Sequence, residues 1–514
     1  MKLTDYIISV LLVIGITFSS CDKWLTVEPS DSRTIQYFYK NPKEMEQALM
    51  GVYNGLLPIS NYYLLLSEVR SDNVWTGMPE EQEQNYMAFN AFRKQISQIS
   101  TLNSAWTDYY EIIARANMFL QKIEGMEFTE PMEDFSIKES FMAEACFLRA
   151  LAYFDLVRFF GRIPVVTVTQ TVEEAMTTPQ SETAAVYADI IIPDLQYAIG
   201  HMNDVAYDYK GKEAGKDSGR ATRAAAKALL GRVYWTMAGF PLWDKSKEAE
   251  AAQLLKEVID AANFSTYWAK TADEWKRIWI SDNDNKYHIF EIQYIMQSDY
   301  GNPMIFNALP RVDKSLCHLK MSGNRIYSSK SLQRLYQQEK TDIRTLHTIR
   351  NGETYFEKFF ENIVKRDTLG YSNIDGQLID RTYFPINFPV IRLEDVMLMY
   401  ADIVGPTPMG IEMVNKIRMR AGLKELTDAQ KASAVFSQCV DEERRRELAG
   451  EGVRWHDIVR SGNFITIMRD CYKQEGVEGV TAATNIIEGM YLYPIPDKQM
   501  QVREGLYQQN EAYK

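Results

Sequence analysis

The chain has 514 residues with a formal net charge of −12, and aromatic residues make up 12% of it. Such an acidic chain lacks the excess of basic residues that binding to a phosphate backbone requires, which argues against nucleic acid as a partner. The length is ample for a large core, arranged either in two domains or in one extended helical array.

The chain begins with an apolar run that ends close to a cysteine. The run from Tyr6 to Phe18 is too short to cross a hydrocarbon core of roughly 30 Å as a helix, but it has the length of a signal-peptide core. Cys21 follows two small residues, which predicts a bacterial lipoprotein signal: residues 1–20 are removed and Cys21 is acylated. An ordinary secretory signal with an incidental cysteine is the alternative.

Much of the chain has the apolar spacing of amphipathic helices. Apolar residues recur at steps of three and four, which predicts a mainly α-helical protein. The predicted helices cover residues 44–57, 104–124, 138–160, 181–200, 220–238, 247–262, 390–404, 411–421 and 434–448.

Two of these helices share an internal match. Arg149 and Lys227 each precede an Ala-Leu pair in the middle of a helix, and the helices are followed by Gly161 and Gly239, so both features are 78 residues apart. That separation is about two units of a 34-residue helix–turn–helix repeat plus an insertion. The match predicts closely packed antiparallel helix pairs, and coincidence among alanine-rich helices is the alternative.

Residues 263–390 have a different character. Strand-like runs occur at Tyr287–Tyr294 and Thr382–Phe388, and loops rich in Asn, Asp, Ser and Gly surround them, as at 281–285 and 298–302. This pattern predicts an irregular, loop-rich region with a few short strands, packed on the helical array. No clear linker separates the two parts, so we expect one compact body.

Four cysteines remain besides Cys21, namely Cys146, Cys317, Cys439 and Cys471. Export would permit disulfides among them, and three pairings are possible. Their wide spacing and the apolar helical surroundings of Cys146 favour free buried thiols. The sequence has no CxxC motif and no zinc-like Cys/His spacing, so no metal site is predicted.

Two stretches contain the side chains that bind sugars, which are aromatic rings for stacking and polar groups for hydroxyls. The first is a loop-like run with Arg70, Asp72, Asn73 and Trp75. A turn with one buried tryptophan is the alternative for this run.

The second stretch covers residues 267–302. Trp275 and Trp279 are four residues apart and share a face if this segment is helical, which is more typical of a core than of a binding surface. Tyr300 and Asn302 lie in a polar loop and are expected to be exposed. Trp106 is a further candidate for binding or for structure, because it opens a predicted helix.

No motif for catalysis is found. The dense charge run Glu442–Arg446 is interpreted as a solvated helix face with ion pairs along the helix, rather than as a catalytic or anion-binding site. His456 and Asp457 are adjacent on a predicted helix and so do not face each other. HExxH, GxSxG, P-loop and GxGxxG patterns are absent from the sequence, so neither an enzyme nor a cofactor is predicted.

Several blocks in chain order carry a family resemblance. They are Cys21–Leu25 with Glu28 and Pro29, Trp106–Asn117, Glu144–Pro164, Arg392–Ala401, Asn415–Leu423, Glu442–Arg460, Tyr493–Pro496, and Gln509 with Asn510. Together they resemble the SusD/RagB family of outer-membrane lipoproteins from the Bacteroidetes, over nearly the whole chain.

The resemblance implies tetratricopeptide-like helix pairs that carry a loop-rich ligand-binding region, here about 263–390, within one nutrient-binding domain, 21–514. It implies a lipoprotein on the cell surface, held in the outer membrane by a lipid on Cys21. Its task would be to bind glycans and deliver them to a SusC-like TonB-dependent transporter. The alternatives are a peptide-binding uptake lipoprotein, a helical-repeat protein that docks other proteins, and a surface glycoside hydrolase, which would need two carboxylates about 5–10 Å apart.

Overall fold

The protein was analysed as a computed structural model. It describes residues 38–77, 85–128, 136–215, 218–262, 268, 269, 271, 274, 275, 278, 279, 287–295, 300–308, 326–349, 358, 359 and 386–514. The predicted signal peptide, Cys21 and Cys317 lie outside these residues. Each helix in the described part is too short or too polar to span a bilayer.

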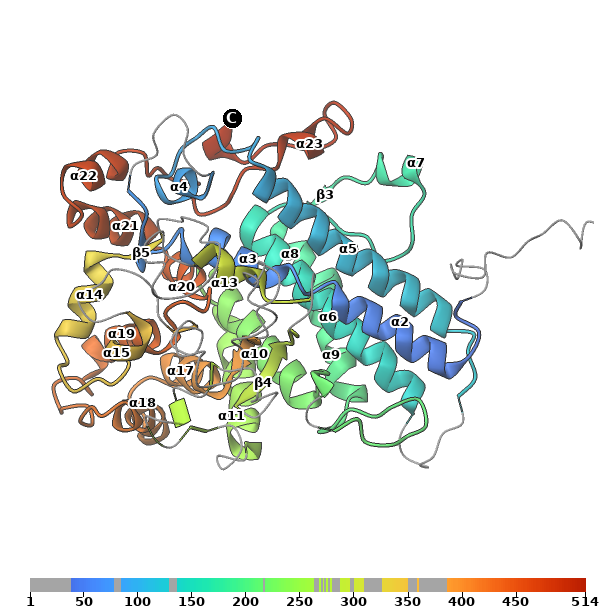
Figure 1. Ribbon diagram of the computed structural model, residues 1–514, viewed down its shortest axis with the longest axis horizontal. Coiled ribbons are helices and arrows are strands. Elements are labelled where there is room, and N and C mark those ends of the chain that lie inside the picture. The colour runs from blue at the N-terminus through green and yellow to red at the C-terminus, as the bar shows by residue number, and fades with distance from the viewer. Residues whose placement is uncertain are drawn as a thin grey trace, which may run out of the picture.

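The described part of the chain is mainly helical, as predicted (Figure 1). Its long helices form an array in which each packs on the next, starting with α2 on α5 and ending with α18 and α19 on α17. In chain order these are α2 (Pro42–Asn54), α5 (Ser100–Ile123), α6 (Ile137–Phe160), α9 (Ile192–His201), α10 (Arg223–Met237), α11 (Glu248–Ala261), α17 (Leu393–Val404), α18 (Pro408–Arg420) and α19 (Ser433–Leu448).

Shorter helical elements connect and cover this array. They are α3 (Ile59–Tyr62), η2 (Tyr63–Glu68), α4 (Asn85–Asn90), α7 (Val172–Ala175), α8 (Thr183–Val186), η3 (Tyr187–Ile191), η5 (Lys245–Lys247), α13 (Pro303–Ala308), α14 (Lys330–Gln337), α15 (Thr345–Thr348), α20 (Arg454–Arg460), α21 (Phe464–Lys473), α22 (Val477–Ala483), α23 (Asp497–Met500) and η7 (Glu511–Tyr513).

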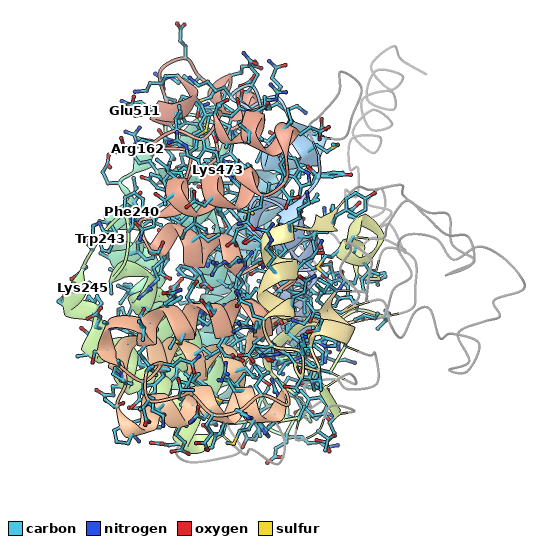
Figure 2. All side chains as sticks on the ribbon, turned by 90° about the vertical axis from the view of Figure 1, so that its left-hand side faces the viewer. Arg162, Phe240, Trp243, Lys245, Lys473 and Glu511 are labelled. Carbon is cyan, nitrogen blue, oxygen red and sulfur yellow. The ribbon has the colours of Figure 1, made fainter. Side chains whose placement is uncertain are left out.

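The internal match corresponds to equivalent places in the array. Arg149 of α6 pairs with Asp194 of α9 at 2.8 Å, and Lys227 of α10 pairs with Glu257 of α11 at 2.8 Å. Each pair therefore joins a helix to the next helix of the array. The two glycines are followed directly by Arg162 and Phe240, and these two residues lie along the same edge of the molecule in Figure 2. In agreement with the predicted helix pairs, α6 therefore packs on α9 and α10 packs on α11.

Short strands complete the fold. The described strands form three two-stranded antiparallel sheets, which pair β1 (Val74–Trp75) with β5 (Tyr327–Ser328), β2 (Ile163–Pro164) with β3 (Gln180–Ser181), and β4 (His288–Ile292) with β6 (Phe388–Arg392). The strand predicted at 287–294 is confirmed by β4. The helix predicted from residue 390 is wrong at its start, because residues 388–392 form β6 and α17 begins at Leu393.

The charge run on α19 is buried from Glu443 to Arg446, so the prediction of a solvated face is wrong for these residues. The predicted ion pairs along the helix are present, from Arg446 to Glu442 at 3.7 Å and to Glu443 at 3.8 Å. Glu447 accepts hydrogen bonds from the guanidinium groups of Arg344, Arg392 and Arg420 at 2.5–3.1 Å, and all four side chains are buried. Burial alone would raise the pKa of Glu447, but these arginines and Lys358 hold it well below its usual value. Within the run, Glu443 pairs with Arg344 at 2.7 Å and with Arg418 at 3.3 Å, and Arg444 pairs with Asp395 at 2.8 Å. The charges of α19 therefore join it to α17, to α18 and to Arg344.

The described cysteines agree with the prediction of free thiols. Cys146 and Cys471 are buried and unpaired, and Cys439 is half-buried and unpaired. Burial raises the pKa of the Cys471 thiol to about 12, so it stays protonated at neutral pH.

Candidate functional site

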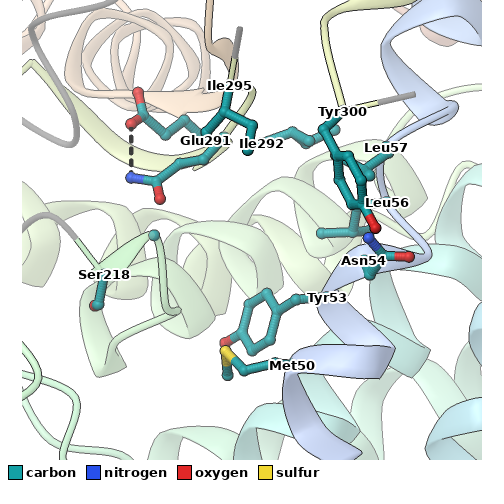
Figure 3. Close-up of a pocket in the computed structure, with 12 residues that line it drawn as sticks. Met50, Tyr53, Asn54, Leu56, Leu57, Ser218, Glu291, Ile292, Ile295 and Tyr300 are labelled. Carbon is teal, nitrogen blue, oxygen red and sulfur yellow. Dashed lines mark hydrogen bonds between the residues drawn. The ribbon is translucent and has the colours of Figure 1, made fainter. Parts of the chain in front are cut away.

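A pocket of about 220 Å³ lies between α2, the end of β4 and the loop that carries Tyr300 (Figure 3). Its walls come from separate parts of the chain that the array brings together. The lining residues are Met50, Tyr53, Asn54, Leu56, Leu57, Ser218, Gly219, Glu291, Ile292, Gln293, Ile295 and Tyr300.

The floor of the pocket is built by α2. This helix begins at Asn41, whose side chain accepts a hydrogen bond from the Glu44 amide, and its opposite face is buried in the core. It ends at Gly55, where a Cβ atom would come within 2.9 Å of Ile112 on α5. That close approach presents the last residues of α2, Tyr53 and Asn54, to the pocket.

Tyr53 is a fixed part of this floor. Its hydroxyl donates to Glu144 at 2.7 Å and accepts from the Ala221 amide at 2.9 Å. Burial, together with the negative charge of Glu144, raises the pKa of the Tyr53 phenol well above its usual value. Glu144 also forms a two-point ion pair with Arg220, so the Tyr53 hydroxyl is fully engaged within the protein.

Tyr300 lies at the rim and is 42% exposed, in agreement with the expectation of an exposed ring. The carbonyl of Tyr300 accepts a hydrogen bond from the Ile295 amide at 3.0 Å, which closes the loop. In Figure 3 the ring extends past Leu56 and Leu57, and its hydroxyl points toward Asn54. The ring is therefore available to a ligand in the pocket.

Asn302 was expected to be exposed, and that prediction is wrong. Its side chain is completely buried: the amide oxygen accepts from the Ser60 hydroxyl at 2.9 Å, and the amide nitrogen donates to the Ile386 carbonyl at 2.8 Å. Tyr294 contacts the same serine at 2.7 Å. Asn302 thus anchors the base of the loop that presents Tyr300.

The pocket wall is mainly apolar, and apart from Glu291 the polar side chains among its described lining residues are uncharged. Among the described lining residues there is no Lys or Arg, and the one carboxylate, Glu291, is buried against His288 and Asn387. The Asn54 side chain is exposed and has no hydrogen-bond partner within the described ranges. An exposed ring beside amide groups suits a neutral ligand that is rich in hydroxyls.

In the first predicted stretch, Asp72 and Asn73 are buried and engaged within the protein. Asp72 accepts from Arg454 at 2.8 and 3.1 Å, and Asn73 bonds Glu68 and Arg445, each at 2.8 Å. Burial alone would raise the pKa of Asp72, but Arg445 and Arg454 hold it below its usual value. Because both side chains are buried and join residues far apart in the chain, the structure argues against the prediction that they bind a glycan.

Arg70 is also buried, in an aromatic cage. Its guanidinium donates to the Met490 carbonyl at 2.8 Å and to the Tyr513 hydroxyl at 2.9 Å. It also lies 4.3 Å from the ring centroids of Phe92 and Tyr493. Burial therefore makes Arg70, like Asp72 and Asn73, unavailable to a glycan at the surface.

The candidate tryptophans differ in accessibility. Trp75 is half-buried, with its ring 5.1 Å from that of Tyr472. Trp279 is only 2% exposed and packs on Trp275 and Phe359. The two tryptophans therefore belong to the core, as their spacing indicated, and they offer no surface to a sugar. Trp106 is 4% exposed and lies below Tyr110 and Tyr507 in a separate groove.

The structure adds Tyr53, Asn54 and Gln293 to the pocket, and the sequence reasoning missed all three. A tyrosine–asparagine pair directly before Gly55, at the end of a helix, was the available signal for the first two. Gln293 follows β4 directly, and only the pairing of β4 with β6 places it here.

Two family models match the chain. One is described as "SusD family" and matches residues 320–513, and the other is described as "Starch-binding associating with outer membrane" and matches residues 23–235. The two matches lie in opposite halves of the chain and do not overlap.

Curated and solved relatives agree with these matches. SusD-like protein P25 of Formosa agariphila is 24% identical over 98% of each chain. The structure of a SusD homolog from Bacteroides thetaiotaomicron is 22% identical, has a TM-score of 0.74, and covers 93% of this chain and 99% of that chain. A laminarin-binding SusD-like protein is 24% identical, has a TM-score of 0.71, and covers 92% of this chain and 100% of that chain. The two solved structures share the fold described above.

Proposed function

Because the chain belongs to the SusD/RagB family, we propose that it is a non-enzymatic lipoprotein that binds oligosaccharide or polysaccharide at the Tyr300 pocket. In this proposal it then delivers the glycan to a SusC-like TonB-dependent transporter. The observation that carries the proposal is the exposed Tyr300 ring at the rim of a pocket with uncharged polar groups. One solved relative is named for binding laminarin, which supports a sugar as the ligand.

Attachment to the outer membrane is the second part of the proposal. The family model that matches residues 23–235 is described as associating with the outer membrane. A lipid on Cys21 would provide that attachment, and it would leave the helical array free to meet a transporter at the cell surface. Residues 21–514 would act as one nutrient-binding domain.

The Tyr300→Ala variant tests the binding site. We expect its affinity for polysaccharide to fall about three- to tenfold, because one stacking surface is lost, while Tyr300→Phe keeps most of the affinity. Affinity gels containing laminarin, soluble starch or other algal and plant polysaccharides measure the binding. Trp243→Ala is the matched control, because Trp243 is 51% exposed and does not line the pocket.

Two results would contradict the proposal of a non-enzymatic glycan-binding protein. One is that no polysaccharide in the panel retards the wild-type protein. The other is that the wild type releases new reducing ends from a polysaccharide that it binds, which would favour a glycoside hydrolase. Equal binding by wild type and Tyr300→Ala would retain glycan binding but reject this pocket.

A further inference from the structure

A second groove, of about 280 Å³, lies on the other side of α5 from the Tyr300 pocket. The lining residues come from α5, from the segment that follows α6, and from a segment near the C-terminus. They are Trp106, Tyr110, Ile113, Ala114, Asn117, Pro164, Val166, Val168, Thr169, Gln170, Ala175, Thr178 and Tyr507.

Helix α5 separates the two cavities. One side of it meets α2, where Ile112 lies against Gly55 and Arg115 donates to the Gly51 carbonyl at 2.7 Å. The groove residues of α5 recur at three- and four-residue steps on another face. Figure 1 shows α5 between α2 and the arm that carries α7. A ligand in one cavity therefore does not occupy the other.

Aromatic rings form one wall of the groove. The ring of Trp106 lies 5.2 Å from that of Tyr110 and 6.2 Å from that of Tyr507. Trp106 is nearly buried and forms the floor, whereas both tyrosines are half-buried. The Tyr110 hydroxyl donates to the Pro164 carbonyl at 2.6 Å, which fixes that ring, and the Tyr507 hydroxyl has no hydrogen-bond partner among the residues described.

The opposite wall is the arm, residues 165–179, which leaves the body at β2 and returns at β3. A capping box between Thr171 and Glu174 starts α7, and the Gln170 amide donates to the Thr178 hydroxyl at 2.9 Å. These bonds give the arm a defined shape without a core of its own, since α7 has no buried residue. Thr169 is exposed, and its hydroxyl is without a partner in the described part of the chain.

The groove combines the features that suit a sugar chain. It offers aromatic rings and unpaired hydroxyls on both walls, and no charged side chain is present among its described lining residues. Its volume is near the lower end of the roughly 300–1,000 Å³ of ligand pockets. We propose that this groove is a second carbohydrate-binding site, for a short segment of the same neutral glycan that the Tyr300 pocket binds; this inference rests on the proposed function.

Filling the groove tests the proposal without removing any of its contacts. Ala114 is an exposed groove residue on α5, so Ala114→Trp places a ring in the cavity, and Thr107→Trp places the same ring on an exposed position of α5 outside it. Tyr507→Ala and Thr169→Ala remove single contacts. The probe is a short oligosaccharide from whichever panel polysaccharide the wild type binds, with stoichiometry and affinity measured by calorimetry.

We expect about two binding sites per wild-type chain and about one in Ala114→Trp, with Thr107→Trp unchanged. Tyr300→Ala should weaken binding at the Tyr300 pocket. The affinity for intact polysaccharide should fall about three- to tenfold in every variant except Thr107→Trp, because one polysaccharide chain occupies both sites at once and the loss of either site weakens its binding. One site in the wild type, or unchanged stoichiometry in a folded Ala114→Trp protein, would overturn the second site while the proposed function stands. No glycan binding by the wild type would overturn both.

Discussion

His456 is a buried group whose protonation opposes folding. Its ring lies 5.1 Å from that of Phe159, and burial, together with the nearby charges of Arg158 and Arg232, lowers its pKa well below 6.5. In the unfolded chain the imidazole keeps its ordinary pKa near 6.5. As the pH falls below about 6.5, the unfolded chain therefore binds a proton that the folded protein does not, and stability is lost.

The His456→Gln variant should consequently lose part of the acid sensitivity of the wild type. We expect the free energy of unfolding of the wild type to fall more between pH 7.5 and 5.5 than that of the variant, by up to about 1 kcal/mol. Urea unfolding at the two pH values measures both. The same pH dependence in the two proteins would show that His456 can be protonated in the folded state.

At the residue scale, the sequence identified polar and aromatic residues that could bind a sugar, but it did not show which of them are buried. Arg70, Asp72 and Asn73 have the polar chemistry of a glycan site, and the fold uses that chemistry to join distant segments. Partners such as Tyr513 and Arg454 are hundreds of residues away, so no local pattern identifies them. Tyr300 was correctly expected to be exposed, because a polar loop with glycine favours the surface.

At the element scale, the charged side chains of α19 from Glu443 to Glu447 form buried ion pairs that stabilise the protein, and they do not face solvent. We expect Glu447→Gln to lower the free energy of unfolding by about 3–5 kcal/mol at pH 7, because the buried guanidinium groups of Arg344, Arg392 and Arg420 would lose their shared carboxylate. Thermal and urea unfolding measure this change. Glu442→Gln is the control on the same helix, since the side chain of Glu442 is 36% exposed, and its effect should stay within about 0.5 kcal/mol.

Most of the helices were predictable from apolar spacing, as with α5 and α11, which each bury one face. Two elements show why the rest was not. The five residues of β6 are all buried, so they lack the alternation of apolar and polar residues that marks a strand. In the sequence they therefore cannot be distinguished from the apolar start of α17. The charge run on α19 has the composition of a solvated face, and only the packing of α17 and α18 around it shows that the face is interior.

At the scale of the whole molecule, the proposed lipid on Cys21 determines where the protein is found. We expect Cys21→Ala to move the protein from the outer-membrane fraction to the soluble fraction and to abolish labelling by a palmitate analogue. The purified variant should bind polysaccharide as the wild type does, because other residues make the contacts that we propose for the glycan. Retention of the variant in the membrane, with labelling intact, would contradict a lipid on this cysteine.

The cage around Arg70 has a consequence for how the chain matures. The guanidinium is held by the Met490 carbonyl and the Tyr513 hydroxyl, which follow Arg70 by 420 and 443 residues and are therefore synthesised much later. Until they arrive, a buried cation would lack its acceptors, which is unfavourable in an apolar surrounding. The part of the native core around Arg70 is therefore incomplete until these later segments have been synthesised, which is compatible with the export that we propose for this chain.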